Sequence, residues 1–272
     1  MKITILTISY NRATTIENAI RSVLSQDYAD IEYIVVDGAS TDGTQQVIEK
    51  YRDKISKYIS EPDTGMYNAL NKAIRLATGD VIGILHSDDA FESTDTLSQY
   101  IEEFERTNAD LVYANGVYCP QLLKGSEKDN GRQTTDNGLP LTPKGGEERI
   151  KRIYNSAPFK PWYLYLGWIP LHTTIFVRRE LFDKYGLYDE SYTIASDYEI
   201  SLRWFTQPGI KKVFMNRRVV RMMLGGKSTN MAMQKRKSTE DARVLKQYKL
   251  WGKLTLLFKI VRKIPQYIVY SI

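Results

Sequence analysis

Residues 81–89 read Val81-Ile82-Gly83-Ile84-Leu85-His86-Ser87-Asp88-Asp89, an apolar run that ends in two adjacent carboxylates. The apolar part predicts a buried strand, and the charges of Asp88 and Asp89 repel each other unless a cation lies beside them. Ligands of open α/β sheets bind at the carboxyl ends of strands, where Mg²⁺ or Mn²⁺ takes carboxylate and phosphate oxygens. The pattern therefore indicates a metal–diphosphate site. The alternative is that Asp88 caps the next helix and Asp89 lies in its first turn, where negative charge is favourable.

Strand-like and helix-like segments alternate through the first half of the chain. Apolar runs and helical spacing predict strands at 3–8, 33–36, 57–60, 81–85 and 111–113, and helices around 16–24, 44–51, 70–77 and 96–107. Thr14 and Glu17 have the spacing of a capping box, and Gly79 suits a left-handed helix end. The alternation predicts an α/β fold with a mostly parallel central sheet and helices on both faces.

The second half has a different composition. Residues 119–161 are rich in Gly, Pro, Asn, Thr, Lys and Glu, which predicts a long functional or mobile loop. Aromatic residues then cluster between Phe159 and Trp168, and they indicate either a platform for a sugar acceptor or a small hydrophobic core. Regular structure is expected again as strands at 174–177, 212–214 and 219–223 and helices near 180–185 and 198–206.

Bulk composition excludes several classes of protein. The 272 residues contain one cysteine and two histidines, so a disulfide framework, a thiolate cluster and a histidine-rich zinc site are not expected. The chain begins directly with a strand-like run, and it contains no apolar stretch approaching about 20 residues. We expect a cytoplasmic protein, soluble or peripheral on the inner face of the cytoplasmic membrane.

Much of the net charge of +6 lies in residues 231–272, where basic residues alternate with apolar and aromatic ones. This mixture is typical of a helix at an anionic membrane surface. The alternative is a helix that packs on the domain and leaves its lysines in solvent. A basic tail also suits nucleic acid, in which case binding would fall steeply with salt and survive loss of the aspartates. Nothing in the first half supports that third interpretation, and no nucleic-acid partner is expected.

Three predicted strands end in polar residues that would share one rim of the sheet: Ser9 to Arg12, Asp37 to Ser40, and Ser87 to Asp89. A base can stack on Tyr10, the imide of a uracil can donate to Asp37, and the aspartate pair can hold a metal on a diphosphate. The first turn lacks the Gly-x-Gly-x-x-Gly of a dinucleotide site, and the chain has no P-loop.

These elements in their order resemble an inverting glycosyltransferase of family 2 with the GT-A fold, over nearly the whole length. The resemblance is carried by Thr7 to Arg12, Val35 to Thr44, Ser60 to Lys72, Ala77 to Asp80, Ser87 to Asp89, His172, Ala195 to Glu199 and Gly225 to Ser228. The Glu-Pro-Asp-x-Gly-x-Tyr segment at 61–67 resembles the branch that builds bacterial capsule, O-antigen and exopolysaccharide units.

The resemblance implies a role for each matching residue. The donor would be bound by Ser9, Tyr10, Asn11, Arg12, Asp37, Asp63, Asn71, Lys72, Ser87 and Asp88. Asp88 and Asp89 would bind Mn²⁺ or Mg²⁺, and Asp197 would be the catalytic base, with a helix N-cap as its alternative role. Contacts to the acceptor or to phosphate are implied for His172, Trp168, Ser196 and Lys227. The chain departs from the family at His86 and at Ser196, where acidic residues are usual.

The implied activity is transfer of a sugar, with inversion, from a nucleoside diphosphate sugar, most often a UDP-sugar, to a lipid-linked saccharide. Residues 1–118 would form the donor half of a Rossmann-like GT-A domain, 119–230 the acceptor half, and 231–272 a basic amphipathic helical tail. The alternative is a nucleotide-sugar-binding protein that has lost transfer activity. His86 and Ser196 favour that alternative, whereas Asp89 and Asp197 argue against it.

Overall fold

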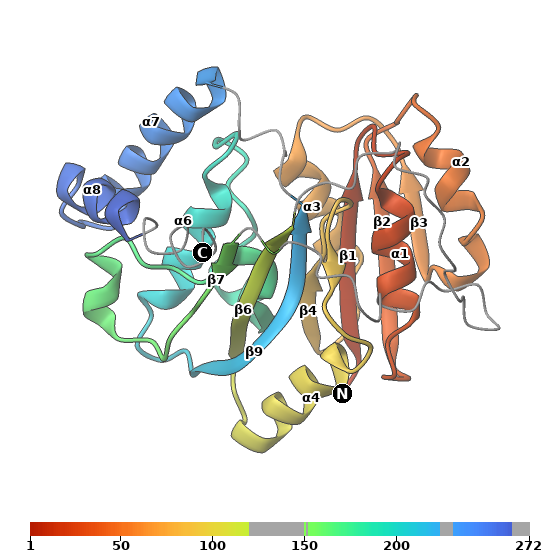
Figure 1. Cartoon of the computed structure of the whole chain (residues 1–272), viewed down its shortest axis with the longest axis horizontal. Coiled ribbons are helices and arrows are strands. Elements are labelled where there is room, and N and C mark those ends of the chain that lie inside the picture. The colour runs from red at the N-terminus through yellow and green to blue at the C-terminus, as the bar shows by residue number, and fades with distance from the viewer. Residues whose placement is uncertain (120–149, 151, 224–230, 263–272) are drawn as a thin grey trace.

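The computed structural model describes residues 1–119, 150, 152–223 and 231–262. One nine-stranded sheet runs through the molecule in the order β3-β2-β1-β4-β8-β6-β9-β5, with β7 paired to β6 (Figure 1). The sheet is the frame of the fold, because helices and loops of both halves of the chain attach to it.

The first half of the sheet is parallel, as predicted. It consists of β1 (Ile3–Ser9), β2 (Ile31–Asp37), β3 (Lys57–Ser60) and β4 (Val81–Ile84). The register pairs Ser9 with Asp37 and Asp37 with Ser60, so that three polar strand ends lie side by side. Parallel strands end at the same edge of the sheet. This edge carries the predicted donor residues and is here named the donor edge.

Helices cover both faces of this sheet, which confirms the layered arrangement. One face packs on α1 (Ile16–Leu24), α2 (Thr44–Glu49) and α4 (Thr96–Thr107), and the other on α3 (Met66–Leu76), α5 (Glu180–Tyr185) and α6 (Ser196–Phe205). Strand residues alternate between the two cores: Val35 belongs to the first and Val36 to the second. A short turn of helix, η1 (Arg52–Lys54), leads from α2 into β3.

The second half of the sheet is mixed, so the expectation of a mostly parallel sheet is wrong there. β8 (Phe176–Arg178) runs antiparallel to β4 and to β6 (Leu111–Cys119), whereas β9 (Lys212–Met223) is parallel to β6. β5 (Ala90–Phe91) and β7 (Arg152–Tyr154) add antiparallel edges. β8 follows the single turns η2 (Pro161–Leu164) and η3 (His172–Thr174) instead of a crossover helix, and parallel pairing of neighbours requires such a crossover.

Several local expectations also differ. The predicted strands at 212–214 and 219–223 are one strand, β9, with irregular pairing to β6 near Asn115. The predicted loop at 119–161 contains β7, and most of its remainder lies outside the described residues. Thr14 does not cap α1, which begins after Thr15, and Glu17 binds Arg21 and Tyr51.

Gly79 is not the left-handed end of α3, because the chain leaves that helix in extended geometry at Ala77. A glycine is needed there for space, since a Cβ on Gly79 would lie 2.5 Å from Thr4 Oγ1 and 2.9 Å from the Lys2 carbonyl oxygen. This contact joins the chain before β4 to the start of β1, and the spacing of residues in the sequence does not predict it.

The C-terminal segment forms two helices, α7 (Met231–Gln247) and α8 (Lys253–Val261), beside α6 (Figure 1). Val244 and Leu245 are fully buried in the same core as α6, and Thr255 of α8 is also fully buried. Both helices therefore pack on the domain. Membrane contact of this segment stays a prediction, and residues 263–272 lie outside the described part of the chain.

Candidate active site

Asp37 joins the loops that follow β1, β2 and β3. Its side chain is fully buried, and its two oxygens accept hydrogen bonds from Ser9 Oγ (2.8 Å), Ser40 N (2.8 Å), Ser40 Oγ (2.5 Å) and Ser60 Oγ (2.9 Å). A carboxylate with these partners lies beneath the rim and shapes it. The predicted contact of Asp37 with a base would require one of these hydrogen bonds to open.

The two loops after β1 and β2 are joined by hydrogen bonds between the backbone amides of each loop and side chains of the other. Asn11 and Ala39 both have left-handed φ angles, of 54° and 58°. The Asn11 amide donates to Ser40 Oγ (2.8 Å), and the Thr41 amide donates to Asn11 Oδ1 (3.0 Å). Asn tolerates this conformation better than most residues, so Asn11 both shapes the turn and bridges the loops. The backbone of the neighbouring Arg12 is fixed by Thr44 Oγ1 at 2.7 Å.

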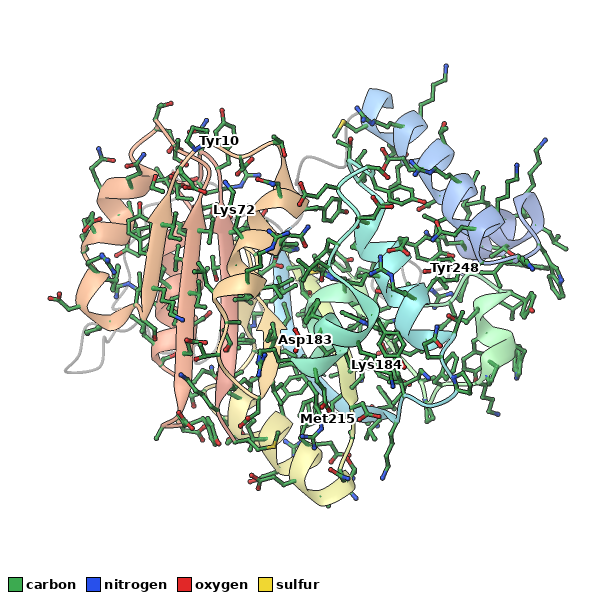
Figure 2. All side chains as sticks on the ribbon, turned by 180° about the vertical axis from the view of Figure 1, so that it is seen from behind. Tyr10, Lys72, Asp183, Lys184, Met215 and Tyr248 are labelled. Atoms are coloured by element: carbon green, nitrogen blue, oxygen red, sulfur yellow. The ribbon has the colours of Figure 1, made fainter. Side chains whose placement is uncertain are left out.

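Tyr10 and Asp63 approach each other across Gly38. The Tyr10 residue is 51% exposed, and it lies near the upper edge of the molecule in Figure 2, where it is labelled. A Cβ built on Gly38 would lie 2.5 Å from Asp63 Oδ2 and 3.3 Å from the Tyr10 ring. Asp63 in turn accepts a hydrogen bond from the Gly65 amide at 2.9 Å. The bare backbone of Gly38 therefore lies between an exposed aromatic ring and a carboxylate, which suits a planar base and a polar sugar.

Two predicted donor residues on α3 have other partners. Asn71 is only 2% exposed, and its amide group bonds to both backbone groups of Tyr188 and to Glu190. It ties α3 to the chain before α6, and its contact with a donor stays a prediction. Lys72 donates to the Pro62 carbonyl (2.9 Å) and pairs with Glu61 (2.8 Å), so it braces the segment that contains Asp63.

The aspartate pair follows β4 in a tight turn closed by the Asp89 amide and the His86 carbonyl at 3.0 Å. Ser87 and Asp89 are buried, whereas Asp88 is partly exposed. Burial raises the pKa of Asp89, the neighbouring charge of Asp88 raises it further, and a hydrogen bond from the Met223 amide acts in the opposite direction. Asp89 Oδ2 has no hydrogen-bond partner among the described residues. A buried carboxylate oxygen without a partner is costly unless a ligand satisfies it.

These residues fit a divalent cation only together with further ligands. Within the described residues no group of three His, Cys, Asp or Glu side chains gathers to hold a metal. Mg²⁺ and Mn²⁺ prefer oxygen ligands and commonly combine one or two carboxylates with substrate phosphates and water. Asp88 and Asp89 would supply the protein part of such a site, and a diphosphate would supply much of the rest.

His86 and His172 lie next to this turn, with their ring centroids 6.4 Å apart. Burial lowers the pKa of both rings, against the opposing charges of Asp88 and Asp197 on His86 and of Asp197 on His172, whose pKa falls to about 4. His172 Nε2 shares a hydrogen bond of 2.7 Å with the Tyr188 hydroxyl. Both rings are thus neutral near pH 7 and present nitrogens that form hydrogen bonds without adding charge.

Asp197 is in the first turn of α6, one residue after the buried Ser196. Its Oδ1 accepts a hydrogen bond from the Tyr198 amide at 2.7 Å, and the Tyr67 hydroxyl lies 3.4 Å away. The N-cap of α6 is Ala195, so neither Asp197 nor Ser196 has the alternative capping role. Asp197 is connected to the two histidines through side-chain contacts, because the Tyr67 ring stacks on Tyr188 at 5.7 Å and the Tyr188 hydroxyl bonds to His172.

Two of the predicted acceptor residues, Trp168 and Ser196, are buried, and a third, Lys227, is not described. Trp168 is 5% exposed and packs its ring against Tyr113, Phe159 and Phe205 in the core, so it is not an accessible platform. The hydrophobic-core interpretation of the aromatic cluster applies to Trp168, because rings from β6, α6 and the segment before η2 surround its indole. Ser196 is fully buried as well. Lys227 lies in 224–230, outside the described residues.

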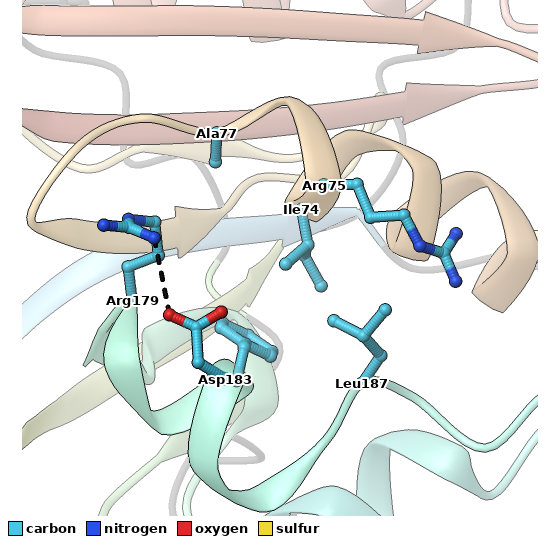
Figure 3. A pocket seen from close by; sticks show the side chains of 7 residues that line it. Ile74, Arg75, Ala77, Arg179, Asp183 and Leu187 are labelled. Atoms are coloured by element: carbon cyan, nitrogen blue, oxygen red, sulfur yellow. Dashed lines mark hydrogen bonds and ion pairs between the residues drawn. The ribbon is translucent and has the colours of Figure 1, made fainter.

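A hollow of about 320 Å³ lies at the other end of α3 (Figure 3). It is lined by Ile74, Arg75, Ala77, Arg179, Phe182, Asp183 and Leu187. Arg179 follows β8, whose end pairs with the beginning of β4, so this hollow is near the amino end of that strand. It is separate from the rim that holds the aspartate pair.

Four residues near the site were missed by sequence reasoning. Tyr67 binds the Ile194 carbonyl, Glu190 binds Asn68 and Asn71, Met223 donates to Asp89, and Glu240 binds the chain before α6. Only Tyr67 belongs to a quoted motif. The other three meet their partners across long stretches of sequence, which no local pattern shows.

The comparisons agree with this geometry. The model "Glycosyl transferase family 2" matches residues 4–186, which include Asp88 and Asp89 and end before Asp197. An uncharacterized glycosyltransferase of Mycobacterium tuberculosis (strain ATCC 25618 / H37Rv) is 36% identical over 202 residues, 74% of this chain and 68% of the relative. A "PGL/p-HBAD biosynthesis glycosyltransferase" of Mycobacterium bovis (strain BCG / Pasteur 1173P2) is 25% identical over 212 residues, 76% of this chain and 70% of that protein.

Solved structures are similar in fold. S. aureus TarS 1–349 in complex with UDP-GlcNAc has a TM-score of 0.64 at 18% identity, over 90% of this chain and 66% of that one. The mannosyltransferase PcManGT from Pyrobaculum calidifontis, in complex with GDP-Man and Mn²⁺, has a TM-score of 0.62 at 20% identity, over 91% of this chain and 64% of that one. This chain thus spans slightly less than two thirds of those structures. Because the family model matches residues 4–186, more than half of its length, the chain belongs to glycosyl transferase family 2.

Proposed function

We propose that the protein is a metal-dependent, inverting glycosyltransferase that takes a sugar from a nucleoside diphosphate sugar, most simply a UDP-sugar. The observation that carries the proposal is the buried Asp89 oxygen without a partner, beside Asp88 at the end of β4. The nucleotide-sugar complexes of TarS and PcManGT support the donor class. Tyr10, Gly38 and Asp63 would contact the nucleoside, and Asp88 and Asp89 would hold the cation.

A divalent cation bound there would neutralise the charge that develops on the leaving diphosphate. The acceptor hydroxyl attacks the anomeric carbon from the opposite side, the bond from that carbon to the phosphate oxygen breaks, and its electron pair leaves with the nucleoside diphosphate. Asp197 takes the proton of the hydroxyl as general base. The neutral rings of His86 and His172, 6.4 Å apart, would orient sugar hydroxyls by hydrogen bonds.

We further propose a lipid-linked saccharide as acceptor, at the inner face of the cytoplasmic membrane, in the assembly of a cell-surface polysaccharide. The outward face of α8 supports this proposal, because Leu254, Leu257, Ile260 and Val261 are exposed there. None of the helices in the described ranges is long and apolar enough to cross a bilayer. Contact would therefore be peripheral.

The experiment is a measurement of nucleotide release from a panel of UDP-sugars and GDP-mannose with Mn²⁺ or Mg²⁺. We expect release from one donor in the wild type, loss with EDTA, and a drop of about 100-fold or more in Asp89→Asn and Asp197→Asn. Asp53→Asn is the matched control, because Asp53 is exposed in η1.

Binding separates transfer from simple recognition. For a transferase, Asp197→Asn retains the affinity for UDP with Mn²⁺, while its turnover is lost. Wild-type binding of UDP without turnover of any donor, with or without simple glycoside acceptors, would instead support the alternative, a binding protein without transfer activity. Mn²⁺ alone should raise the melting temperature of the wild type and not that of Asp89→Asn.

A further inference from the structure

The chain between α5 and α6 connects three parts of the molecule. Residues 189–195, here named the base loop, lead directly into the first turn of α6 and therefore into Asp197. On one side the loop is bound by α3: the Tyr67 hydroxyl donates to the Ile194 carbonyl (2.6 Å) and accepts from the Asp197 amide (3.3 Å). The position of Asp197 thus depends on how this loop is held.

On its other side the base loop is bound by α7 through one carboxylate. Glu240 accepts hydrogen bonds from the amides of Thr193 (3.1 Å), Ile194 (2.8 Å) and Ala195 (3.0 Å), and its side chain is 9% exposed. Arg236, one turn earlier, pairs with the same carboxylate at 3.1 Å. Three consecutive amides bound by one buried, charged acceptor fix the orientation of three successive peptide planes.

Glu240 binds the three amides that precede α6, whereas the first-turn amides of Asp197 and Tyr198 are bound by the Tyr67 hydroxyl and by Asp197 Oδ1. Ala195, the N-cap residue of α6, has no side chain that can bind the amides of the first turn. A carboxylate at the start of a helix also interacts favourably with the helix dipole. The start of α6, and the direction in which Asp197 leaves it, is thus set from a helix 45 residues further along the chain, as the separation of Ala195 and Glu240 shows.

We propose that Glu240 is a positioning residue for catalysis, which holds the base loop so that Asp197 faces the acceptor hydroxyl. The inference rests on the proposed role of Asp197 as base. Like Asp197, Glu240 lies beyond the residues that the family model matches, since that match ends at residue 186. It also gives α7 a part in catalysis besides its packing.

The test compares Glu240→Gln with Glu102→Gln, which makes the same change at an exposed position of α4. In Glu240→Gln the charge is lost, and the new NH₂ group faces the amides of the base loop. We expect kcat for donor turnover to fall about 10- to 100-fold, with the KM for the donor and the affinity for UDP unchanged, because the donor edge is formed by other loops. We also expect the acidic limb of the pH profile of kcat to shift, since the surroundings of Asp197 change.

A double-mutant cycle separates this inference from the proposed function. If Glu240 acts through Asp197, the Glu240→Gln substitution has no further effect on kcat in an Asp197→Asn background. Equal turnover in wild type and Asp197→Asn would overturn the role of Asp197 itself. Additive losses, or a loss explained by a lower fraction of folded protein in urea unfolding, would overturn the positioning role of Glu240 alone.

Two further measurements keep the inference testable if Glu240→Gln folds poorly or no donor is turned over. Arg236→Gln removes the partner of the carboxylate and a hydrogen bond to Thr193 Oγ1 but keeps Glu240, and we expect a smaller fall in kcat in the same direction. The carboxyl-carbon NMR chemical shift of Asp197 at pH 7 should differ between the wild type and the Glu240 or Arg236 variant. The same chemical shift in all of them would contradict the proposal.

Discussion

Asp37 lies at the centre of the donor edge, with both of its oxygens bound by the side chains and backbone of neighbouring loops. Four hydrogen bonds to a fully buried carboxylate hold three loop starts in one geometry. The exposed groups at the rim, such as the Tyr10 ring, depend on the buried Asp37 carboxylate for their placement. A buried residue can thus determine a binding edge without touching the ligand.

Gly38 provides a prediction at the same scale. In Gly38→Ala the new methyl group would lie 2.5 Å from Asp63 Oδ2, so that this carboxylate must move from its position beside Tyr10. We expect the affinity for UDP to fall about tenfold, which corresponds to ~1.4 kcal/mol, while the melting temperature changes little. Isothermal titration calorimetry measures the first quantity. Gly209→Ala is the control, because a Cβ there has open space, and equal affinity in both variants would contradict the prediction.

Single residues show where sequence reasoning succeeds and where it fails. Asp88, Asp89 and Asp197 were predicted to share one site, and the structure brings them together with both histidines. Asn71 and Trp168 were also predicted to face ligands, and both are buried. The partners that bury Asn71 are more than 100 residues away in the sequence, so its burial depends on tertiary contacts that no local motif contains.

At the level of elements, β2 is fastened to the link between α3 and β4 by a buried ion. Glu32 is 4% exposed and accepts hydrogen bonds from Thr4 Oγ1 (2.7 Å), the Thr78 amide (2.7 Å) and Thr78 Oγ1 (2.8 Å), with Lys57 Nζ at 3.1 Å. Burial alone would raise the pKa of this carboxyl, but the hydrogen bonds outweigh it and lower the pKa from 4.5 to about 2. The ionised form therefore stabilises the amino ends of three strands.

This depressed pKa predicts a loss of stability in acid. The folded protein binds the proton less readily than the unfolded chain, so the stabilisation is present above about pH 4.5 and disappears as the pH falls toward 2. It is worth on the order of 3 kcal/mol, at about 1.4 kcal/mol for each pH unit. Urea unfolding between pH 7 and 3 should show a shallower pH dependence in Glu32→Gln than in wild type. The exposed control Glu102→Gln should follow the wild type, and parallel curves for Glu32→Gln would refute the assignment.

Elements of the parallel half were predictable, whereas those around β8 were not. Strand–helix alternation is a local signal, and it identified β1 to β4 and the helices that cover them. The insertion of β8 between β4 and β6 depends on pairing between segments about 65 to 95 residues apart, as the pairs Val112–Phe176 and Val81–Arg178 show. Hydrophobic periodicity can identify β8 as a strand, but it does not predict which distant strands pair with it.

The whole molecule combines a donor edge from the first half with a base and an apolar surface from the second. On α8, Leu257 and Ile260 are 54% and 65% exposed, and Trp251 stacks near Tyr165 with a centroid distance of 5.0 Å. The buried side of the same helix carries Lys259, which pairs with Asp241 at 2.8 Å. Thr255 and Lys259 of α8 thus face inward, whereas the apolar side chains of Leu254, Leu257, Ile260 and Val261 are exposed.

The exposed apolar side chains of α8 predict binding to a membrane surface. We expect the protein to sediment with vesicles of phosphatidylglycerol, and the double substitution Leu257→Glu/Ile260→Glu to abolish this binding without lowering the melting temperature. The control Asn18→Glu/Gln46→Glu adds the same two negative charges at exposed positions of α1 and α2 and should still bind. Equal sedimentation of both double variants would exclude α8 as the contact.

The clamp on the base loop has a consequence for the newly made protein. The aromatic ring, the glycine and the aspartates of the donor edge all lie within the first 90 residues, whereas Glu240 follows some 150 residues later. At ribosomal rates of about 5–20 residues per second, the interval between the two is about 8 to 30 s. During that time a nascent chain has the loops of the proposed donor site but lacks the contact proposed to orient Asp197. Translation order thus delays completion of the proposed catalytic centre until α7 has been synthesised.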